Sequence, residues 1–508
     1  MPWPPPLTPR LLSGMAGLFV AALMGGFNNR LGALGLADIR GIHGFAYDDA
    51  SWLTSFYSAG ELVIMPFVIW LITIFSFRRM AIFWLMAVIC LAAPQPLIQN
   101  LPLLIGLRFL QGVACGALIF MLMISIFMFL PPRIRMYGFG FYAMVATVTP
   151  YTGIWMTALW TDVLHDWRWL YWQSIPLALL ALGLVIRGLP HSAGRPERLK
   201  TTNWRGMVCI IPGSIMLAIS FDQGMRLDWF NSSFVTWGIV CGSALMIIYG
   251  ISEWFHQDPF LQLRIFISHR NIFIGLMILL CVLTMALAAS LLPMSYLSRI
   301  WDYRPMQSAS VGLIVALPQI VLGPLIAFLL YRRFIDSRAL YILSMLLIAG
   351  ACYWGAHVDE QWIAEQFYPA QALLAVGLPL AVITTIFVTS SRVTPQEGPS
   401  MGGAINTLRC LGILLGNAIV SQFCHTRQMW HYEALREHSS SLNPALHAMS
   451  EAQTAQTVNN QAFTSSIADA YCLLGTMALI IAVIILCLQY TAPYRAKAPV
   501  GQKRETHA

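Results

Sequence analysis

Five charged side chains lie inside long apolar stretches of this sequence, where a charge is costly. They are Arg30, Glu61, Arg108, Asp222 and Arg409. A charge in the hydrocarbon of a membrane costs at least about 2.5 to 3.5 kcal/mol, so such residues normally face a cavity or a partner. A buried carboxyl group can bind and release a proton near neutral pH, whereas an arginine stays charged. The set therefore predicts a polar, proton-carrying pathway between apolar helices.

Arg30 and Glu61 are expected to form a pair across this pathway. Counted from the outer ends of their apolar stretches, their depths differ by roughly 6 Å, which an arginine side chain can cover. The functional interpretation is a proton- or substrate-coupled switch in which Glu61 carries the proton. The alternative is a static ion pair that only holds two helices together.

The elements that position these charges are expected to be membrane-spanning helices. Of the 508 residues, 58% are hydrophobic and only 10% are charged, whereas charged residues make up about 25% of soluble domains. Apolar runs long enough to cross about 30 Å of hydrocarbon recur throughout the chain. We expect an all-α integral membrane protein with about fourteen spans, at residues 12–36, 51–73, 80–98, 103–130, 137–161, 168–188, 206–223, 233–252, 272–296, 308–331, 339–357, 366–391, 402–422 and 467–490.

The distribution of basic residues predicts the orientation of these spans. If the N-terminus is cytoplasmic, 20 of the 30 Lys and Arg residues fall in cytoplasmic segments, as expected from the retention of positive charge on that side. This predicts a multi-pass protein of the cell inner membrane with both termini cytoplasmic. The net charge of +8 is thus a topology signal, and we expect no nucleic-acid partner.

Four segments carry motifs of one known family, in order along the chain. They are Ser51–Phe56 with Pro66 and Trp70-Leu71, Leu107–Gly112, Phe221–Phe230, and Asn406–Arg409 with Gly412 and Gly416. In these segments the chain resembles the fourteen-span drug:proton antiporters (EmrB/QacA-like) of the major facilitator superfamily. The resemblance implies a major facilitator fold of two six-helix bundles plus two extra helices. It also implies proton-coupled efflux of small amphipathic compounds by alternating access.

The resemblance implies a role in proton coupling for Arg108, which we expect in the inner-to-middle part of its span; the alternative is that Arg108 hydrogen-bonds backbone carbonyls and fixes helix packing. Asp222 is a candidate second protonation site, or a loop anchor that pairs with Arg226. The candidate substrate-binding residues are Asn28, Arg30, Tyr57, Tyr151, Trp155, Asn406 and Arg409. For the aromatic residues the alternative is ordinary packing or an interfacial belt, and for Arg409 it is helix packing.

Two departures from the family pattern bear on the substrate. The acidic residue of the family's first span is replaced by Asn28, and Arg30 is an added cation. The antiporter motif of the fifth span is reduced to Pro150–Gly153, followed by the bulky Trp155 and Met156. The first departure shifts the expected substrate from lipophilic cations toward organic anions, aromatic acids or fatty acids. The second leaves open an importer or uniporter for an organic acid or siderophore-like molecule, or a transport-dead receptor.

The expected organisation follows from these spans. We predict a six-helix bundle at residues 1–188, a cytoplasmic linker and two inserted helices at 189–270, and a second six-helix bundle at 271–491, which includes a long external loop at 423–466. A basic cytoplasmic tail follows at 492–508.

The sequence contains no H-E-x-x-H, G-x-S-x-G or P-loop motif, so we do not expect an enzyme. We expect membrane lipid and a small-molecule substrate as partners and the proton gradient in place of a cofactor. The resemblance also implies a periplasmic adaptor and an outer-membrane channel, with the external loop as the candidate docking surface.

Overall fold

The computed structural model describes residues 7–132, 134–264, 270–332, 336–391, 393, 397–438 and 450–489, apart from the side chains of residues 31, 33 and 332. Every regular element in these ranges is a helix, as the sequence predicts. The basic tail expected at 492–508 lies outside the described residues.

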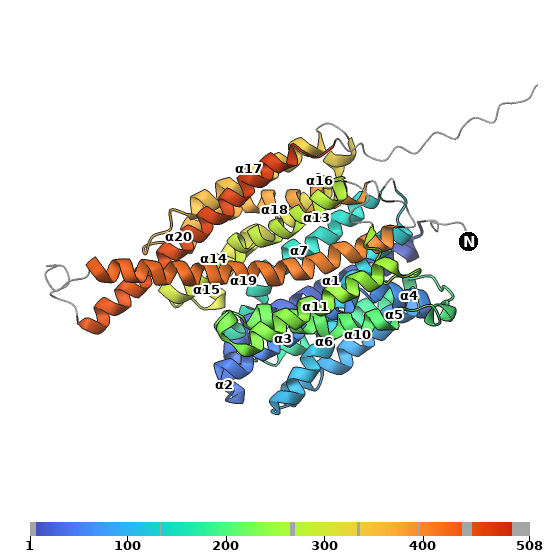
Figure 1. Ribbon diagram of the computed structural model, residues 1–508, viewed down its shortest axis with the longest axis horizontal. Helices are drawn as coiled ribbons and strands as arrows, with labels where there is room; N and C mark the ends of the chain where they lie inside the picture. The colour runs from blue at the N-terminus through green and yellow to red at the C-terminus, as the bar shows by residue number, and fades with distance from the viewer. Residues whose placement is uncertain are drawn as a thin grey trace, which may run out of the picture.

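The helices form two groups joined by a helical pair (Figure 1). The first group, called the N-half, consists of α1 (Pro9–Leu34), α2 (Leu36–His43), α3 (Tyr47–Ile64), α4 (Val68–Phe75), α5 (Phe77–Ala92), α6 (Leu101–Phe129), α7 (Arg135–Ala158), α8 (Trp169–Trp172) and α9 (Ser174–Gly188). The joining pair is α10 (Trp204–Gln223) and α11 (Ser233–Phe255). The second group, called the C-half, consists of α13 (Arg270–Met285), α14 (Leu287–Ile300), α15 (Pro305–Ala316), α16 (Gln319–Arg332), α17 (Ser337–Gly355), α18 (Tyr368–Ser390), α19 (Gly398–His438) and α20 (Glu451–Ile485).

The expected count of fourteen spans is not confirmed. Within the described residues, 12 helices are long and apolar enough to cross a membrane, and 13 spans result if the bent pair α3 and α4 is one span. Helix α7 matches the span expected at 137–161 in position and has 24 residues, but it is not among the helices that are apolar enough. Its sequence is rich in Gly, Thr and Tyr because much of its surface packs on other helices, α1, α15, α16 and α18 among them, instead of facing lipid.

Prolines interrupt two of the expected spans. Helices α3 and α4 meet at a bend of 57°, next to Pro66. Pro318 separates α15 from α16. A third break, at Ala286 between α13 and α14, lies at no proline, since Pro293 is inside α14. A proline removes a backbone N–H donor and its ring clashes with the preceding turn, so it bends or interrupts a helix.

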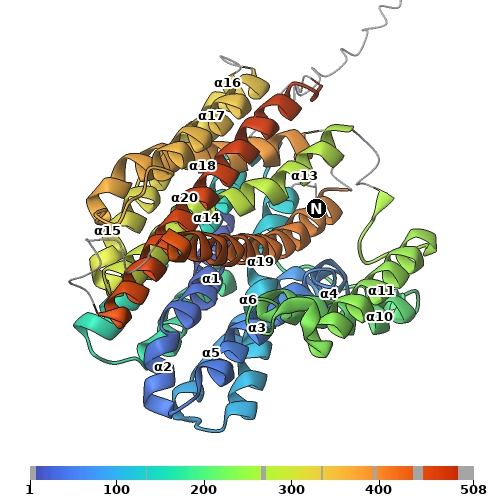
Figure 2. The same ribbon diagram turned by 60° about the vertical axis from the view of Figure 1, so that its left-hand side comes forward.

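The pair α10 and α11 packs beside the N-half, not between the two halves. Helix α10 contacts α3 and, less extensively, α19, and Figure 2 shows the pair as a hairpin at the edge of the bundle. Trp237, Ile247 and Ile251 on α11 are exposed, as expected for side chains that face lipid. The two helices expected as an insert therefore cover one flank of the N-half.

The polar stretch expected as a long external loop is largely helical. Helix α19 continues to His438 and α20 begins at Glu451, and both project beyond the other helices in Figure 1. The 41 residues of α19 span about 60 Å, roughly twice the hydrocarbon thickness. Residues 439–449 of the expected loop lie outside the described part of the chain.

Close contact between α3 and α6 depends on two glycines. A Cβ atom on Gly112 would lie 2.1 Å from the carbonyl oxygen of Tyr57, and one on Gly60 would lie 2.2 Å from that of Phe109. Neither oxygen can move away without bending its helix. The two glycines thus set the distance between the helix that carries Glu61 and the helix that carries Arg108.

We predict that Gly112→Ala lowers the thermal stability of the detergent-solubilised protein, because overpacking of a tight contact costs about 1 to 3 kcal/mol. The matched control is Gly106→Ala on the same helix, where a Cβ would meet no atom within 4 Å. Melting temperatures from tryptophan fluorescence compare the two variants. Equal melting temperatures would contradict this account of the α3–α6 contact.

Candidate functional site

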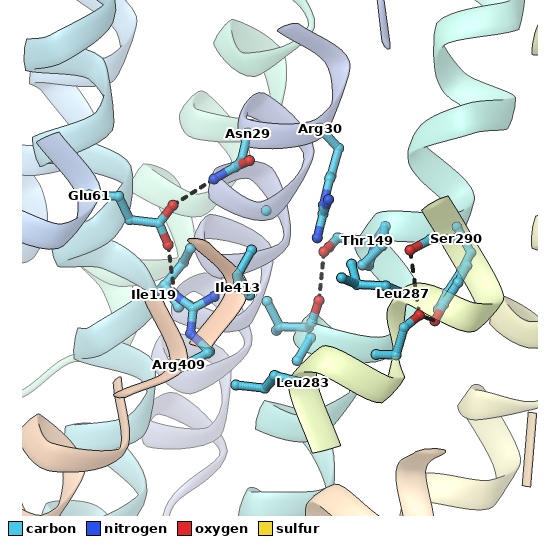
Figure 3. Close-up of a pocket in the computed structure, with 16 residues that line it drawn as sticks. Asn29, Arg30, Glu61, Ile119, Thr149, Leu283, Leu287, Ser290, Arg409 and Ile413 are labelled. Carbon is cyan, nitrogen blue, oxygen red and sulfur yellow. Dashed lines mark hydrogen bonds and ion pairs between the residues drawn. The ribbon is translucent and has the colours of Figure 1, made fainter. Parts of the chain in front are cut away.

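A small cavity lies between the two halves and contains three of the five charged residues singled out in the sequence. Its volume is about 70 Å³, and the N-half lines it with residues of α1, α3, α6 and α7, and the C-half with residues of α13, α14 and α19 and with Ala286 between α13 and α14. The lining residues are Gly26, Asn29, Arg30, Glu61, Ile119, Val145, Ala146, Thr149, Pro150, Tyr151, Leu283, Ala286, Leu287, Ser290, Arg409 and Ile413. Figure 3 shows Glu61, Asn29 and Arg409 together on one side of this cavity and Arg30 beside Thr149.

Glu61 is the centre of the polar contacts in the cavity. Its Oε1 accepts a hydrogen bond of 2.7 Å from Nη2 of Arg409, and its Oε2 accepts one of 2.7 Å from Nδ2 of Asn29. The Glu61 side chain is 7% exposed. Since Arg409 lies on α19 and Glu61 on α3, this ion pair joins the C-half to the N-half (Figure 3).

The predicted pair between Arg30 and Glu61 is wrong. Both oxygens of Glu61 already accept hydrogen bonds from Arg409 and Asn29, and Arg30 has no hydrogen bond or ion pair among the described residues. Its side chain starts against Gly153 of α7, where a glycine Cβ would lie 3.2 Å from the Cβ of Arg30. In Figure 3 the side chain extends toward the Thr149 side of the cavity, away from Glu61.

Asn28, one residue before Asn29, points away from the cavity. It is 1% exposed, and its Nδ2 lies 3.5 Å from the Sγ of Cys115 on α6. Successive residues of a helix are turned by about 100°, so neighbouring side chains face different partners. The sequence-based choice of Asn28 as a lining residue is therefore wrong, and Asn29 takes that place.

Arg108 lies outside the cavity and at a different depth from the one expected. It is seven residues after Leu101, the start of α6, and its Nη2 donates to the carbonyl oxygen of Asn28 at 3.4 Å. Its Nη1 donates to Gln111 at 2.8 Å, and its guanidinium lies 4.5 Å from the centre of the Tyr57 ring. Arg108 therefore lies near the end of the bundle where α1 finishes and α6 begins. With the cytoplasmic N-terminus that the sequence predicts, this is the outer end of the span and not its inner-to-middle part. Arg108 and Tyr57 thus form a buried packing contact among α1, α3 and α6.

Asp222 and Arg226 do not form the pair that was considered for them. Asp222 accepts a hydrogen bond from the Ser55 hydroxyl group, and Arg226 pairs with Asp48 at 3.1 Å. Both contacts join the end of α10 to the start of α3 and lie outside the cavity. Asp222 therefore connects the joining pair to the N-half.

The remaining predicted lining residues divide into one inside and two outside the cavity. Tyr151 lines it, and its hydroxyl group donates to the Ala286 carbonyl oxygen at 3.5 Å. Trp155 lies one turn further along α7, is 39% exposed and does not line the cavity, so that expectation is wrong. Asn406 is buried one turn before Arg409 and accepts a 2.8 Å hydrogen bond from Tyr142 of α7, which gives it a contact between the halves instead of a lining role.

Sequence reasoning missed Asn29, Thr149 and Ser290, which supply polar groups to the cavity. It also gave no partner to Arg409, which lies 348 positions from Glu61 in the sequence. The only signal was the type of each residue, because no acidic residue lies close to Arg409 on α19 and no basic residue lies close to Glu61 on α3. Among the described residues, no group of three His, Cys, Asp or Glu side chains could hold a metal ion.

Chemically, the arrangement is a charge-dependent contact between Glu61 of the N-half and Arg409 of the C-half. An ionised Glu61 forms a charge-assisted hydrogen bond with Arg409, which is stronger than a bond between neutral groups. Protonation removes the negative charge and leaves Arg409 facing a neutral acid. The state of one carboxyl group thus determines how strongly the two halves attract each other at the cavity.

Comparison with known proteins agrees with this architecture. The multidrug export protein EmrB of Escherichia coli (strain K12) is 23% identical over 445 residues, covering 85% of this chain and 84% of its own. The fatty acid resistance protein FarB of Neisseria gonorrhoeae is 25% identical over 492 residues, covering 90% and 91%. A bacterial homologue of the human lysosomal transporter Spinster, solved in an inward-facing and unoccupied conformation, has the same fold with a TM-score of 0.56 at 12% identity, covering 96% of this chain and 100% of that one. The family model of the Major Facilitator Superfamily matches residues 17–417, so the chain belongs to that superfamily, as its motifs indicate.

Proposed function

We propose that this transporter exports small amphipathic compounds across the inner membrane, driven by the proton gradient, with Glu61 as the group that couples proton and substrate movement. The observation that carries the proposal is the ion pair between Glu61 and Arg409, a buried, titratable contact between the two halves. The similarity to EmrB, a multidrug export protein, supports the direction of transport, and the similarity to FarB, a fatty acid resistance protein, agrees with it.

The coupling follows from the electrostatics of this pair. With Glu61 ionised, separation of the halves leaves two charges without partners in a region of low dielectric, which costs about 3 to 5 kcal/mol for a buried pair. With Glu61 protonated, the remaining contact is a hydrogen bond to a neutral acid, worth much less. Proton binding therefore lowers the cost of separating α3 from α19, and proton release favours their return.

The size of the cavity fits a contracted state of such a cycle. A drug-sized ligand occupies a pocket of about 300 to 1,000 Å³, whereas this cavity measures about 70 Å³. An amphipathic substrate enters only when the halves move apart on one side. Alternating access of the N-half and the C-half around this cavity is the motion that we propose.

We further propose that both termini lie in the cytoplasm and that the proton gradient is the sole energy source, without a cofactor.

The projecting ends of α19 and α20 are our candidate contact with a periplasmic adaptor, which would connect the transporter to an outer-membrane channel. These ends present exposed Met429 and Trp430. Such side chains suit a protein contact because they combine large apolar area with adaptable packing.

We predict that Glu61→Gln abolishes proton movement linked to transport, because glutamine keeps the shape of the side chain but cannot titrate. Purified protein in liposomes with an internal pH dye is challenged with a panel of lipophilic cations and aromatic acids. Substrate-dependent proton flux should appear in the wild type and vanish in the variant. Asp48→Asn, which removes a carboxylate exposed outside the cavity, should leave the flux unchanged.

If Glu61→Gln retains proton flux, Glu61 is not the coupling group, and Asp222→Asn then tests the second acid. The direction of transport is measured separately, by substrate accumulation in inverted and right-side-out vesicles. Accumulation in inverted vesicles supports export. Accumulation only in right-side-out vesicles would replace export by import.

A double-mutant cycle measures the contact between the halves. We predict that Glu61→Gln and Arg409→Gln each destabilise the protein, and that the double variant loses much less than their sum, with a coupling free energy of about 1.5 to 3 kcal/mol. The matched cycle on Asp48 and Arg226, where the Asp48 side chain is 68% exposed, should give less than about 1 kcal/mol. Additive effects at Glu61 and Arg409 would show that the pair does not hold the halves together.

A further inference from the structure

We infer that Arg30 is the binding site for the carboxylate group of an amphipathic monocarboxylic acid, and that such acids are the substrate class of this transporter. The inference rests on the proposed function, since it takes the cavity between the halves as the substrate site. It goes further by assigning the charge of the substrate and the side chain that recognises it.

The first argument is the balance of charge in the cavity. The ionisable lining residues that carry charge at neutral pH are Arg30, Arg409 and Glu61. Arg409 and Glu61 compensate each other at 2.7 Å, so Arg30 leaves one positive charge in excess. One monovalent anion neutralises the cavity, whereas a cationic substrate would add a second uncompensated charge at a cost of several kcal/mol.

The second argument is that the Arg30 guanidinium is free to bind. Arg30 lines the cavity and is partly exposed there, and among the described residues its nitrogen atoms have no hydrogen-bond partner. A guanidinium carries five N–H donors in a planar fork that matches the two oxygens of a carboxylate. In contrast, the Nε of Arg409 is enclosed and its Nη2 is bound to Glu61.

The third argument is the shape and polarity of the surroundings. Gly153 leaves space for the aliphatic part of Arg30, which holds the charged end at the cavity. Thr149 and Ser290 add hydroxyl groups on that side, and Ile119, Leu283 and Leu287 supply an apolar wall. A polar end beside an apolar wall suits a molecule with a carboxylate head and an apolar tail.

The volume of the cavity limits what binds there without movement. About 70 Å³ accepts a small head group or a few water molecules, but not the tail of an amphipathic acid. The head group is thus recognised at Arg30, while the tail lies along the surfaces of α7 and α14 that separate when the halves open.

Binding of decanoate to the purified full-length protein, measured by isothermal titration calorimetry without any proton gradient, tests this inference. Decanol and decyltrimethylammonium have the same tail with a neutral and a cationic head, and salicylate has the same charge on an aromatic body. In the wild type we expect decanoate to bind at least about tenfold more tightly than decanol, since a hydrogen bond to a charged group is worth about 1.5 to 3 kcal/mol. Salicylate distinguishes aromatic acids from fatty acids as the preferred class.

Variants then assign the effect to one side chain. Arg30→Gln should weaken decanoate binding at least about tenfold and leave decanol binding unchanged. Arg30→Lys keeps the charge but loses the planar fork, so its affinity for decanoate should lie between those of the wild type and Arg30→Gln. Arg40→Gln, outside the cavity on α2, is the matched control and should bind decanoate like the wild type. Decanoate affinity that is unchanged in Arg30→Gln, or equal affinities of decanoate and decanol for the wild type, would overturn the inference.

Failure of this inference can be distinguished from failure of the proposed function. Glu61→Gln keeps Arg30, so it should still bind decanoate even though it loses proton coupling. Binding that depends on Arg30 in a protein without proton flux would support the anion site and refute the coupling. Proton flux with cations alone, together with no preference for decanoate over decanol, would support proton coupling and refute the anion site at Arg30.

Discussion

The contact between Glu61 and Arg409 is the interaction on which the arrangement of the two halves depends. A carboxylate whose side chain is 7% exposed cannot remain ionised in an apolar bundle without a partner. The N-half supplies only the neutral Asn29, and the charge is compensated from α19 of the C-half. The helices that carry the two residues must therefore meet, and the cavity forms where their side chains keep the backbones apart.

Other contacts between the halves respond far less to protonation. Tyr142 donates to Asn406 at 2.8 Å, and Tyr331 donates to the Pro132 carbonyl oxygen at 2.6 Å. The other ion pair between the halves within the described residues, Asp162 with Arg304, is 4.0 Å long and involves an Arg304 side chain that is 78% exposed. An exposed pair of this kind is worth at most about 1 kcal/mol. The buried pair is thus the charge-dependent contact with enough free energy to change the balance between states.

Helix α7 lets the halves come close without burying further charge. Gly140 approaches the Gly323 carbonyl oxygen of α16, where an added Cβ would lie at 3.0 Å. Gly153 on the same helix makes room for Arg30. The segment Pro150–Gly153, which departs from the family motif, is therefore the part of α7 that faces both the cavity and the added cation. Arg30 and the segment 150–153, one from each of the two departures, therefore meet in one place.

The sequence by itself determined that the chain is an all-helical membrane protein of the major facilitator type, because apolar length, basic loop residues and ordered motifs are local properties. It also identified Glu61, Arg30 and Arg409 as unusual, because a charge in an apolar run is visible without a fold. It did not determine the partner of Glu61 or the orientation of Asn28 and Asn29. These depend on how helices far apart in the sequence cross and rotate against one another, and only the tertiary structure decides that, because packing of whole helix faces, not any single residue, sets their angles and distances.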